Sequence, residues 1–219
     1  MSGAAKPAVP TLPPRARVSE GARVLVVVAH PALHRSRANR RMVRAIRELP
    51  GITVHDLYEA YPEFEIDVPH EKALLLAHET IVWQHPFYWY STPAMMKEWF
   101  DLVLEFGWAY GPKGTALAGK RVLSAITTGG PETAYHREGY NRFTMRELLA
   151  PIEQTARLCQ MEYLPPWISH GARAADATGL DGAAQQYRAV IEALRDGVPT
   201  SDWGDDRGLM RLDAGVGAP

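Results

Sequence analysis

The sequence has little cysteine, no excess of either charge and no long hydrophobic run. Its 219 residues include one cysteine, Cys159, so no internal disulfide can form, and no Cys/His group has the spacing of a zinc site. The 24 Lys and Arg residues balance 25 Asp and Glu residues to a formal charge of −1, which argues against a nucleic-acid binder. No apolar stretch approaches the roughly 20 residues that cross a bilayer. We therefore expect a cytoplasmic protein without a bound metal, free or peripherally attached to a membrane.

Aromatic residues, in contrast, are concentrated in one part of the chain. Of the twenty in the sequence, ten lie between Trp83 and Tyr110. The two ends have a different composition from this body. Residues 1–22 are rich in Ala and Pro and are predicted to form a disordered arm, and residues 198–219 a flexible tail whose one anchor candidate is Trp203. Residues 23–197 are long enough for one domain with a sizeable core.

Within this domain, strand-like and helix-like segments alternate. The strand pattern covers residues 23–29, 53–57, 80–84, 121–126 and 162–164, and the helix pattern covers 36–49, 71–78, 92–106, 144–159 and 180–195. Thr92 is a candidate N-cap, and Thr144 begins a capping box with Glu147. Such alternation predicts an α/β fold with three layers, in which a parallel sheet of strand order 2-1-3-4-5 carries helices on both faces. Ligands of such sheets bind beyond the carboxyl ends of the strands.

The loop after the first strand, residues 30–39, places Ser36 at the start of a helix. Free N–H groups, the helix dipole and a hydroxyl together form an anion site that suits a phosphate. Four arginines at this helix start would repel one another unless an anion lay between them: Arg35, Arg37, Arg40 and Arg41. The same residues are also compatible with a simple N-cap and a solvated face. The loop lacks both nucleotide-binding glycine motifs, and the G-x-S-x-G turn of a serine hydrolase is absent.

The loops after the third and fourth strands add an aromatic wall and a glycine turn. Four consecutive aromatic residues, 87–90, follow the third strand, and their exposure to water would be unfavourable unless a flat group covered them. A hydrophobic plug or a dimer interface is the alternative. After the fourth strand, Thr127-Thr128-Gly129-Gly130 offers hydroxyl and N–H donors to the polar edge of a ring. The three loops together meet the requirements of a flavin mononucleotide.

Ten ordered motifs between residues 22 and 197 resemble those of the flavodoxin-like NAD(P)H:quinone oxidoreductases, and in particular the branch that includes the ancillary proteins of glutathione-regulated potassium-efflux systems. They are Ala29-His30-Pro31, Ser36-x-x-Asn39, Asp56-Leu57-Tyr58, Trp83-Gln84-His85-Pro86, Trp89-Tyr90-Ser91, Gly107 to Gly111, Gly114 to Leu117, Gly119-Lys120, Thr127 to Gly130 and Leu164-Pro165-Pro166.

The resemblance implies a flavodoxin-like fold, FMN in preference to FAD, NADPH or NADH as reductant, a quinone acceptor and a homodimer with its sites at the subunit interface. It also implies two-electron reduction of the quinone, for which we predict a ping-pong cycle of hydride transfer. The cofactor-binding residues would be His30, Ser36, Arg37, Ala38, Asn39, Pro86, Phe87, Tyr88, Trp89, Tyr90, Thr127, Thr128, Gly129 and Gly130. Tyr135 and His136 are candidates for substrate contact or proton donation. The alternative function is that of a regulatory subunit, at the inner face of the membrane, that binds and activates a potassium-efflux antiporter.

Overall fold

A central parallel sheet organises the computed structural model, which describes residues 24–210. The strands are β1 (Val24–Val28), β2 (Ile52–Asp56), β3 (Thr80–Pro86), β4 (Arg121–Thr127), β5 (Glu162–Tyr163) and β6 (Trp167–Ser169). All pairings are parallel and the order is β2-β1-β3-β4-β5, with β6 also paired to β4. The predicted strand order 2-1-3-4-5 is confirmed. The arm predicted over residues 1–22 lies outside the described residues.

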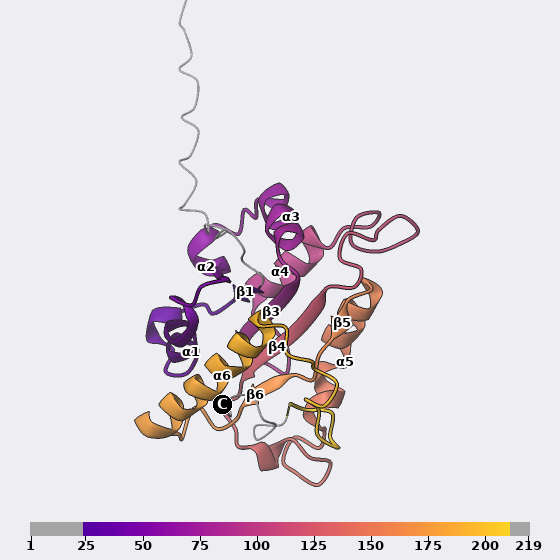
Figure 1. Cartoon of the computed structure of the whole chain (residues 1–219). Coiled ribbons are helices and arrows are strands. Elements are labelled where there is room, and N and C mark those ends of the chain that lie inside the picture. Colours follow the sequence, from indigo (N-terminus) through magenta and orange to yellow (C-terminus); the bar gives the residue numbers. More distant parts are fainter. Residues whose placement is uncertain (1–23, 211–219) are drawn as a thin grey trace, which may run out of the picture.

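Helices cover both faces of this sheet (Figure 1). They are α1 (Asn39–Ile46), α2 (Leu57–Ala60), α3 (Val68–Ala77), α4 (Ala94–Val103), α5 (Met145–Leu158) and α6 (Ala177–Arg195), together with two single 3-10 turns, Leu33–Arg35 and Glu132–Ala134. In β1, Leu25 and Val27 pack on the side of α2 to α5, whereas Val24, Val26 and Val28 pack on the side of α1 and α6. A strand buried on both faces must be apolar throughout, which explains the unbroken run of valine and leucine in β1.

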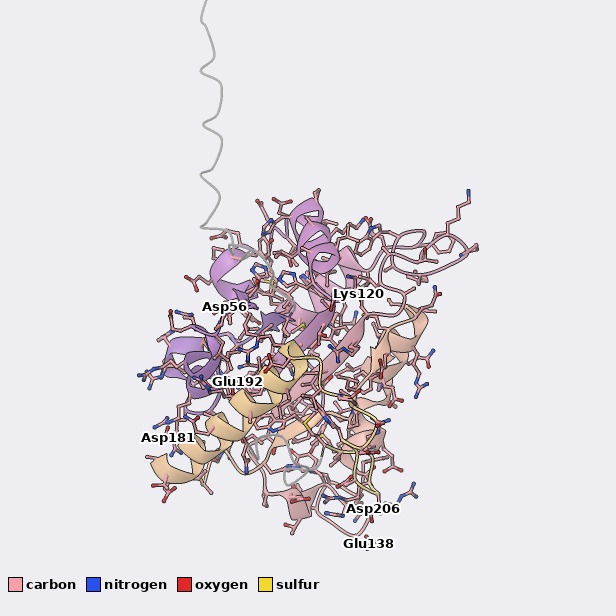
Figure 2. The ribbon with its side chains drawn as sticks, in the orientation of Figure 1. Asp56, Lys120, Glu138, Asp181, Glu192 and Asp206 are labelled. Atoms are coloured by element: carbon pink, nitrogen blue, oxygen red, sulfur yellow. The ribbon has the colours of Figure 1, made fainter. Side chains whose placement is uncertain are left out.

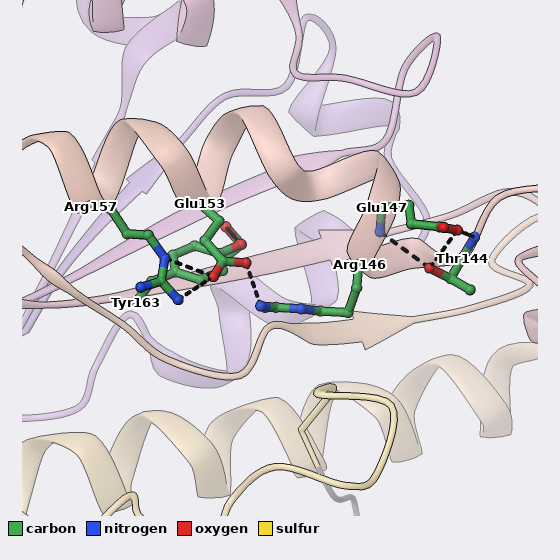
Figure 3. A network of polar contacts seen from close by, with 7 residues as sticks. Thr144, Arg146, Glu147, Glu153, Arg157 and Tyr163 are labelled. Carbon is green, nitrogen blue, oxygen red and sulfur yellow. Dashed lines mark hydrogen bonds and ion pairs between the residues drawn. The ribbon is translucent and has the colours of Figure 1, made fainter.

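Helix α5 begins as its sequence predicts. Thr144 Oγ1 accepts a hydrogen bond from the N–H of Glu147 at 3.2 Å, and Glu147 Oε2 accepts one from the N–H of Thr144 at 2.8 Å, so the capping box is confirmed (Figure 3). Further along α5, Glu153 forms ion pairs with Arg146 and Arg157. The predicted N-cap at Thr92 is wrong, because α4 begins at Ala94 and Pro93 occupies the cap position.

The segment after α6 departs from the predicted tail at 198–219. Trp203 and Met210 are buried in the cluster beneath α6, and Leu209 is buried on the other side of the sheet. The N–H of Met210 donates to Pro166 O at 3.1 Å, which holds the segment beside β6. The packed part of the chain therefore extends to residue 210, with Trp203 as its anchor. No helix in residues 24–210 is long and apolar enough to span a membrane.

Candidate functional site

Three loops leave the sheet together, after β1, β3 and β4. Pro86 lies beside Thr127 in the parallel register of β3 and β4. The N–H of Ala29 donates to Gln84 O, and the N–H of Phe87 donates to Thr127 O, both at 2.9 Å. The three loops therefore start at the same level, around the point where the chain connections diverge to the two sides of β1 and β3. Open α/β sheets bind their ligands at this position.

The loop after β1 offers both a capped helix and free donors. Ser36 Oγ accepts a hydrogen bond from the N–H of Asn39 at 3.1 Å, and α1 begins at Asn39 rather than at Ser36. The N–H groups of Arg37 and Ala38 have no acceptor within residues 24–210. These two donors lie at the positive end of the α1 dipole, where an anion is favoured. The sequence is compatible with either an anion site or a simple N-cap at this loop, and the structure allows both at once.

Two of the four arginines at this helix start bind elsewhere. Arg37 donates to Arg173 O at 3.0 Å and to Ala175 O at 2.5 Å. Arg41 pairs with Asp181 at 2.7 Å; Figure 2 labels Asp181 on α6. These contacts tie α1 to the start of α6. The guanidinium of Arg37 is thus hydrogen-bonded within the protein, whereas the backbone N–H group of Arg37 has no partner in the described residues.

A buried chain of hydrogen bonds supports the floor of the site. Tyr187 in α6 donates to Gln84 Oε1 at 2.9 Å, Gln84 Nε2 donates to Asn39 Oδ1 at 3.2 Å, and Asn39 Nδ2 donates to Thr127 Oγ1 at 2.8 Å. We call these four residues the buried relay. Asn39 and Thr127 are both predicted as cofactor-binding residues. Their side-chain groups form hydrogen bonds within the relay, and both residues are at most 5% exposed. Sequence reasoning assigned no role to Gln84 or Tyr187, although Gln84 is an amide within a buried strand.

The aromatic loop after β3 forms a tight and strained turn. Tyr88 and Ser91 exchange backbone hydrogen bonds at 3.1 and 3.0 Å, and Trp89 and Tyr90 between them have φ values of 50° and 62°. Such turns normally contain Asn or Gly, because the left-handed region is unfavourable by roughly 1–2 kcal/mol per residue for other side chains. The turn leaves Trp89 93% exposed. Strain and exposure of this kind concentrate at functional sites.

His30 lies beside this turn. Its ring centroid is 6.0 Å from that of Tyr88, and the Nδ1 atom accepts a hydrogen bond from the N–H of Ala32 at 3.1 Å. Burial lowers the pKa of His30, with a smaller contribution from His34 in the same direction. His30 is therefore neutral at pH 7 and serves to shape the loop.

The loop after β4 presents two free N–H groups. Thr128 Oγ1 donates to Gly130 O at 2.8 Å and lies 3.2 Å from His170 Nδ1, so this hydroxyl is used within its own turn. The N–H groups of Gly129 and Gly130 have no acceptor in the described part of the chain. Burial lowers the pKa of His170 to about 4, which keeps this imidazole neutral. Sequence reasoning did not identify His170, which follows the three-residue strand β6.

A cavity of about 540 Å³ lies between the aromatic turn and the glycine loop. We call it the ring pocket. Its lining residues are Phe87, Trp89, Tyr90, Gly130, Pro131, Thr133, Ala134, Tyr135, Tyr140 and Asn141. Tyr88, predicted to line the ring, is not among them and instead faces His30.

The structure separates the two candidate proton donors. Tyr135 lines the ring pocket, and burial raises its pKa, so the hydroxyl stays protonated. His136 lines a smaller cavity of about 150 Å³, which Tyr135 and His170 also border. Tyr135 is consequently the side chain of this pair that can reach a ligand in the ring pocket.

Comparison with known proteins agrees with this architecture. A family model described as a flavodoxin-like fold matches residues 22–191. The chain belongs to the flavodoxin-like family. Among its members, the glutathione-regulated potassium-efflux system ancillary protein KefG of Pectobacterium carotovorum is 48% identical over 170 residues, which cover 78% of this chain and 93% of that protein.

Solved structures are also similar to this chain in sequence and in fold. General stress protein 14 of Treponema denticola, solved in complex with FMN, is 38% identical with a TM-score of 0.75, and the match covers 78% of this chain and 99% of that one. An NADPH-quinone reductase from P. pentosaceus is 31% identical with a TM-score of 0.70, covering 77% and 96%. The predicted resemblance to flavodoxin-like quinone reductases and to potassium-efflux ancillary proteins is confirmed.

Proposed function

We propose that the protein is an FMN-dependent NAD(P)H:quinone oxidoreductase whose flavin lies at the carboxyl edge of β1, β3 and β4. The observation that carries the proposal is the ring pocket, which has the aromatic turn on one side and Gly130 on the other. The N–H groups of Gly130 and of its neighbour Gly129 have no acceptor within residues 24–210. Its volume of about 540 Å³ lies within the usual range of small-molecule sites. The names of the FMN-bound and quinone-reducing relatives support the same assignment.

The chain's own groups fit the three parts of FMN. The N–H groups of Arg37 and Ala38 and the hydroxyl of Ser36 would hold the phosphate at the start of α1. The N–H groups of Gly129 and Gly130 would bind the polar edge of the ring. The aromatic turn would cover a face of the ring, and this explains why strained aromatic residues stand at a surface position. When bound, FMN supplies the hydride-transfer chemistry.

The remaining residues orient ligands and hold protons. Tyr135, protonated because burial raises its pKa, would donate a hydrogen bond to a quinone oxygen in the ring pocket. His170 stays neutral behind it, with its ring centroid 5.5 Å from that of Tyr135. The reductant and the quinone would use the same pocket, so we infer that they bind in turn. His136 would act from the smaller cavity, as part of the wall rather than in contact with substrate.

A homodimer would complete the site. Trp89, Tyr140 and Phe106 are 93%, 91% and 70% exposed, although large aromatic side chains are enriched in protein interfaces. Trp89 and Tyr140 line the ring pocket, so a second copy packed on them would also exclude water from the ligand.

The first experiment measures flavin binding and turnover. Full-length protein is mixed with FMN, passed through a desalting column and examined for flavin absorption bands, and quinone reduction is then followed with NADPH and with NADH. We expect one FMN per chain and turnover with at least one reductant. Ser36→Ala should weaken FMN binding, whereas Ser201→Ala, in the segment after α6, should not. Colourless protein after FMN addition would contradict the proposal.

The second candidate function is that of an ancillary subunit of a potassium-efflux system. Such a subunit would lie in the cytoplasm, at the inner face of the membrane. Its support is the 48% identity to KefG over 78% of the chain. Potassium efflux is measured in cells that contain an antiporter with wild-type protein, with Ser36→Ala or with neither. Efflux that needs the protein but survives loss of flavin binding would make this role primary. Efflux unaffected by the protein would exclude it for that antiporter.

A further inference from the structure

A row of arginines along α1 and its C-cap has no acidic partner in the described part of the chain. Arg40, Arg44 and Arg47 are spaced four and three residues apart, so they share one face of the helix. Arg40 donates to His34 O at 3.2 Å, and within residues 24–210 no carboxylate lies at ion-pair distance from any of the three. In contrast, the neighbouring Arg41 is paired with Asp181. Like charges at this spacing repel one another, so the row is unfavourable without an anion.

These arginines line a cavity of about 510 Å³, separate from the ring pocket, which we call the arginine cavity. The opposite wall comes from the end of β2 and from α2, where Asp56, Tyr58 and Glu59 line it. Asp56, labelled in Figure 2, is half-buried, and its carboxylate accepts a hydrogen bond from the N–H of Tyr58 at 3.1 Å. The cavity therefore has cationic donors on one side and anionic acceptors on the other.

This pattern selects the chemistry of the ligand. Guanidinium groups bind a dianionic phosphate, and carboxylates accept hydrogen bonds from sugar hydroxyls or a base amino group. The Tyr58 ring offers an apolar surface to a base and is held in place, because its hydroxyl accepts a hydrogen bond from the N–H of Met95 at 3.4 Å. An acidic peptide fits less well, since Asp56 and Glu59 would repel it. A nucleoside that carries a phosphate matches all three features.

The arginine cavity adjoins the proposed flavin site. His30 lines the arginine cavity, and its ring lies 6.0 Å from that of Tyr88, which follows the ring-pocket residue Phe87. We infer that the arginine cavity binds the phosphorylated adenosine end of the reductant, and that the protein consequently uses NADPH in preference to NADH. This inference rests on the proposed function, because it assumes that the nicotinamide end reaches the ring pocket.

The test separates binding from turnover. FMN-loaded full-length protein is titrated calorimetrically with 2′,5′-ADP, which carries the distinguishing phosphate, and with 5′-ADP, which lacks it. We expect 2′,5′-ADP to bind at least about tenfold more tightly, since even one charged hydrogen bond of this kind is worth about a tenfold change in affinity. The double variant Arg44→Ala/Arg47→Ala should remove this difference. The same variant should lower kcat/KM for NADPH and leave kcat/KM for NADH unchanged.

The control is Lys113→Ala/Arg157→Ala, which also removes two exposed positive charges; they line neither cavity, and one of them, Arg157, is paired with Glu153. Equal affinity for the two ADP isomers, or an unchanged preference in the arginine variant, would overturn the inference while leaving the proposed function intact. If neither reductant supports turnover but 2′,5′-ADP binds and depends on the arginines, the cavity assignment holds and the proposed function fails. Thermal melting and FMN absorption of each variant confirm that it folds and retains the cofactor.

Discussion

The buried relay makes a quantitative prediction about stability and flavin binding. In Tyr187→Phe the hydroxyl that donates to Gln84 Oε1 is lost, with little change in packing volume. Tyr187 and Gln84 are both fully buried, so the Gln84 oxygen has no water to replace this donor. An unsatisfied buried acceptor costs about 1–3 kcal/mol. For a chain of this size each kcal/mol corresponds to roughly 2–4 °C, so the melting temperature should fall by about 2–12 °C.

The same substitution should also affect the loop after β1, residues 30–39. Gln84 donates to Asn39, the first residue of α1, so a reoriented amide displaces the loop whose N–H groups would hold the phosphate. We expect the dissociation constant for FMN to rise about threefold or more, the equivalent of about 0.6 kcal/mol. Chemical denaturation of the flavin-free protein measures the first effect. Quenching of FMN fluorescence on binding measures the second.

Tyr163→Phe is the matched control. Tyr163 also donates to a buried partner, Ser124 Oγ at 2.9 Å, but it belongs to β5 and does not contact the loops of the site. This variant should lose stability and keep wild-type affinity for FMN. The reasoning would be refuted if Tyr187→Phe unfolded within about 0.5 kcal/mol of wild type, the size of an ordinary surface substitution, or if both variants weakened FMN equally.

Three further predictions concern other parts of the molecule. Burial lowers the pKa of His85 to about 4, whereas the unfolded chain takes up this proton below about pH 6.5. The free energy of unfolding should therefore fall by up to about 3 kcal/mol as the pH drops from 7 to 4. His85→Leu should reduce this pH dependence, measured by chemical denaturation at several pH values across that range. Trp89→Ala should raise the dimer dissociation constant more than about tenfold in sedimentation experiments, because exposed aromatic residues dominate interfaces. Arg207→Ala breaks the ion pair with Glu132 beside the ring-pocket loop and a second one with Asp205. It should change stability by less than about 1 kcal/mol and raise the KM for quinone at constant kcat.

Each of these predictions has an outcome that contradicts it. An unchanged pH dependence of stability in His85→Leu would mean that this imidazole takes up its proton at the same pH in the folded and the unfolded protein. Monomeric wild-type protein at micromolar concentration would remove the basis for the Trp89 prediction. For Arg207, the control is Arg195→Ala, which breaks an exposed ion pair with Asp196 away from the loop; the same KM from both variants would show that the Glu132 contact does not position the ring pocket.

Several elements were readable from the sequence because their signals are local. The continuous apolar run of β1 is typical of a strand buried on both faces, and the Thr144 capping box needs only residues three apart. Short elements carry too few residues for a periodic pattern, so α2 and β6 were missed. The sequence around Trp203 has the pattern of a flexible tail because the residues that bury it come from the sheet and α6, which are distant in sequence.

The sequence by itself determined which loops form the site, because strand order and the position of a strand end follow from hydrophobic patterning and connection rules. Only the tertiary structure decided what each loop residue does. Asn39 and Thr127 are predicted from the sequence to bind the cofactor. In the structure their side chains bond to each other, and Asn39 also accepts a hydrogen bond from Gln84, which Tyr187 supports in the buried relay. A side chain's hydrogen-bond partner depends on packing between elements far apart in the chain, and no local pattern records that packing.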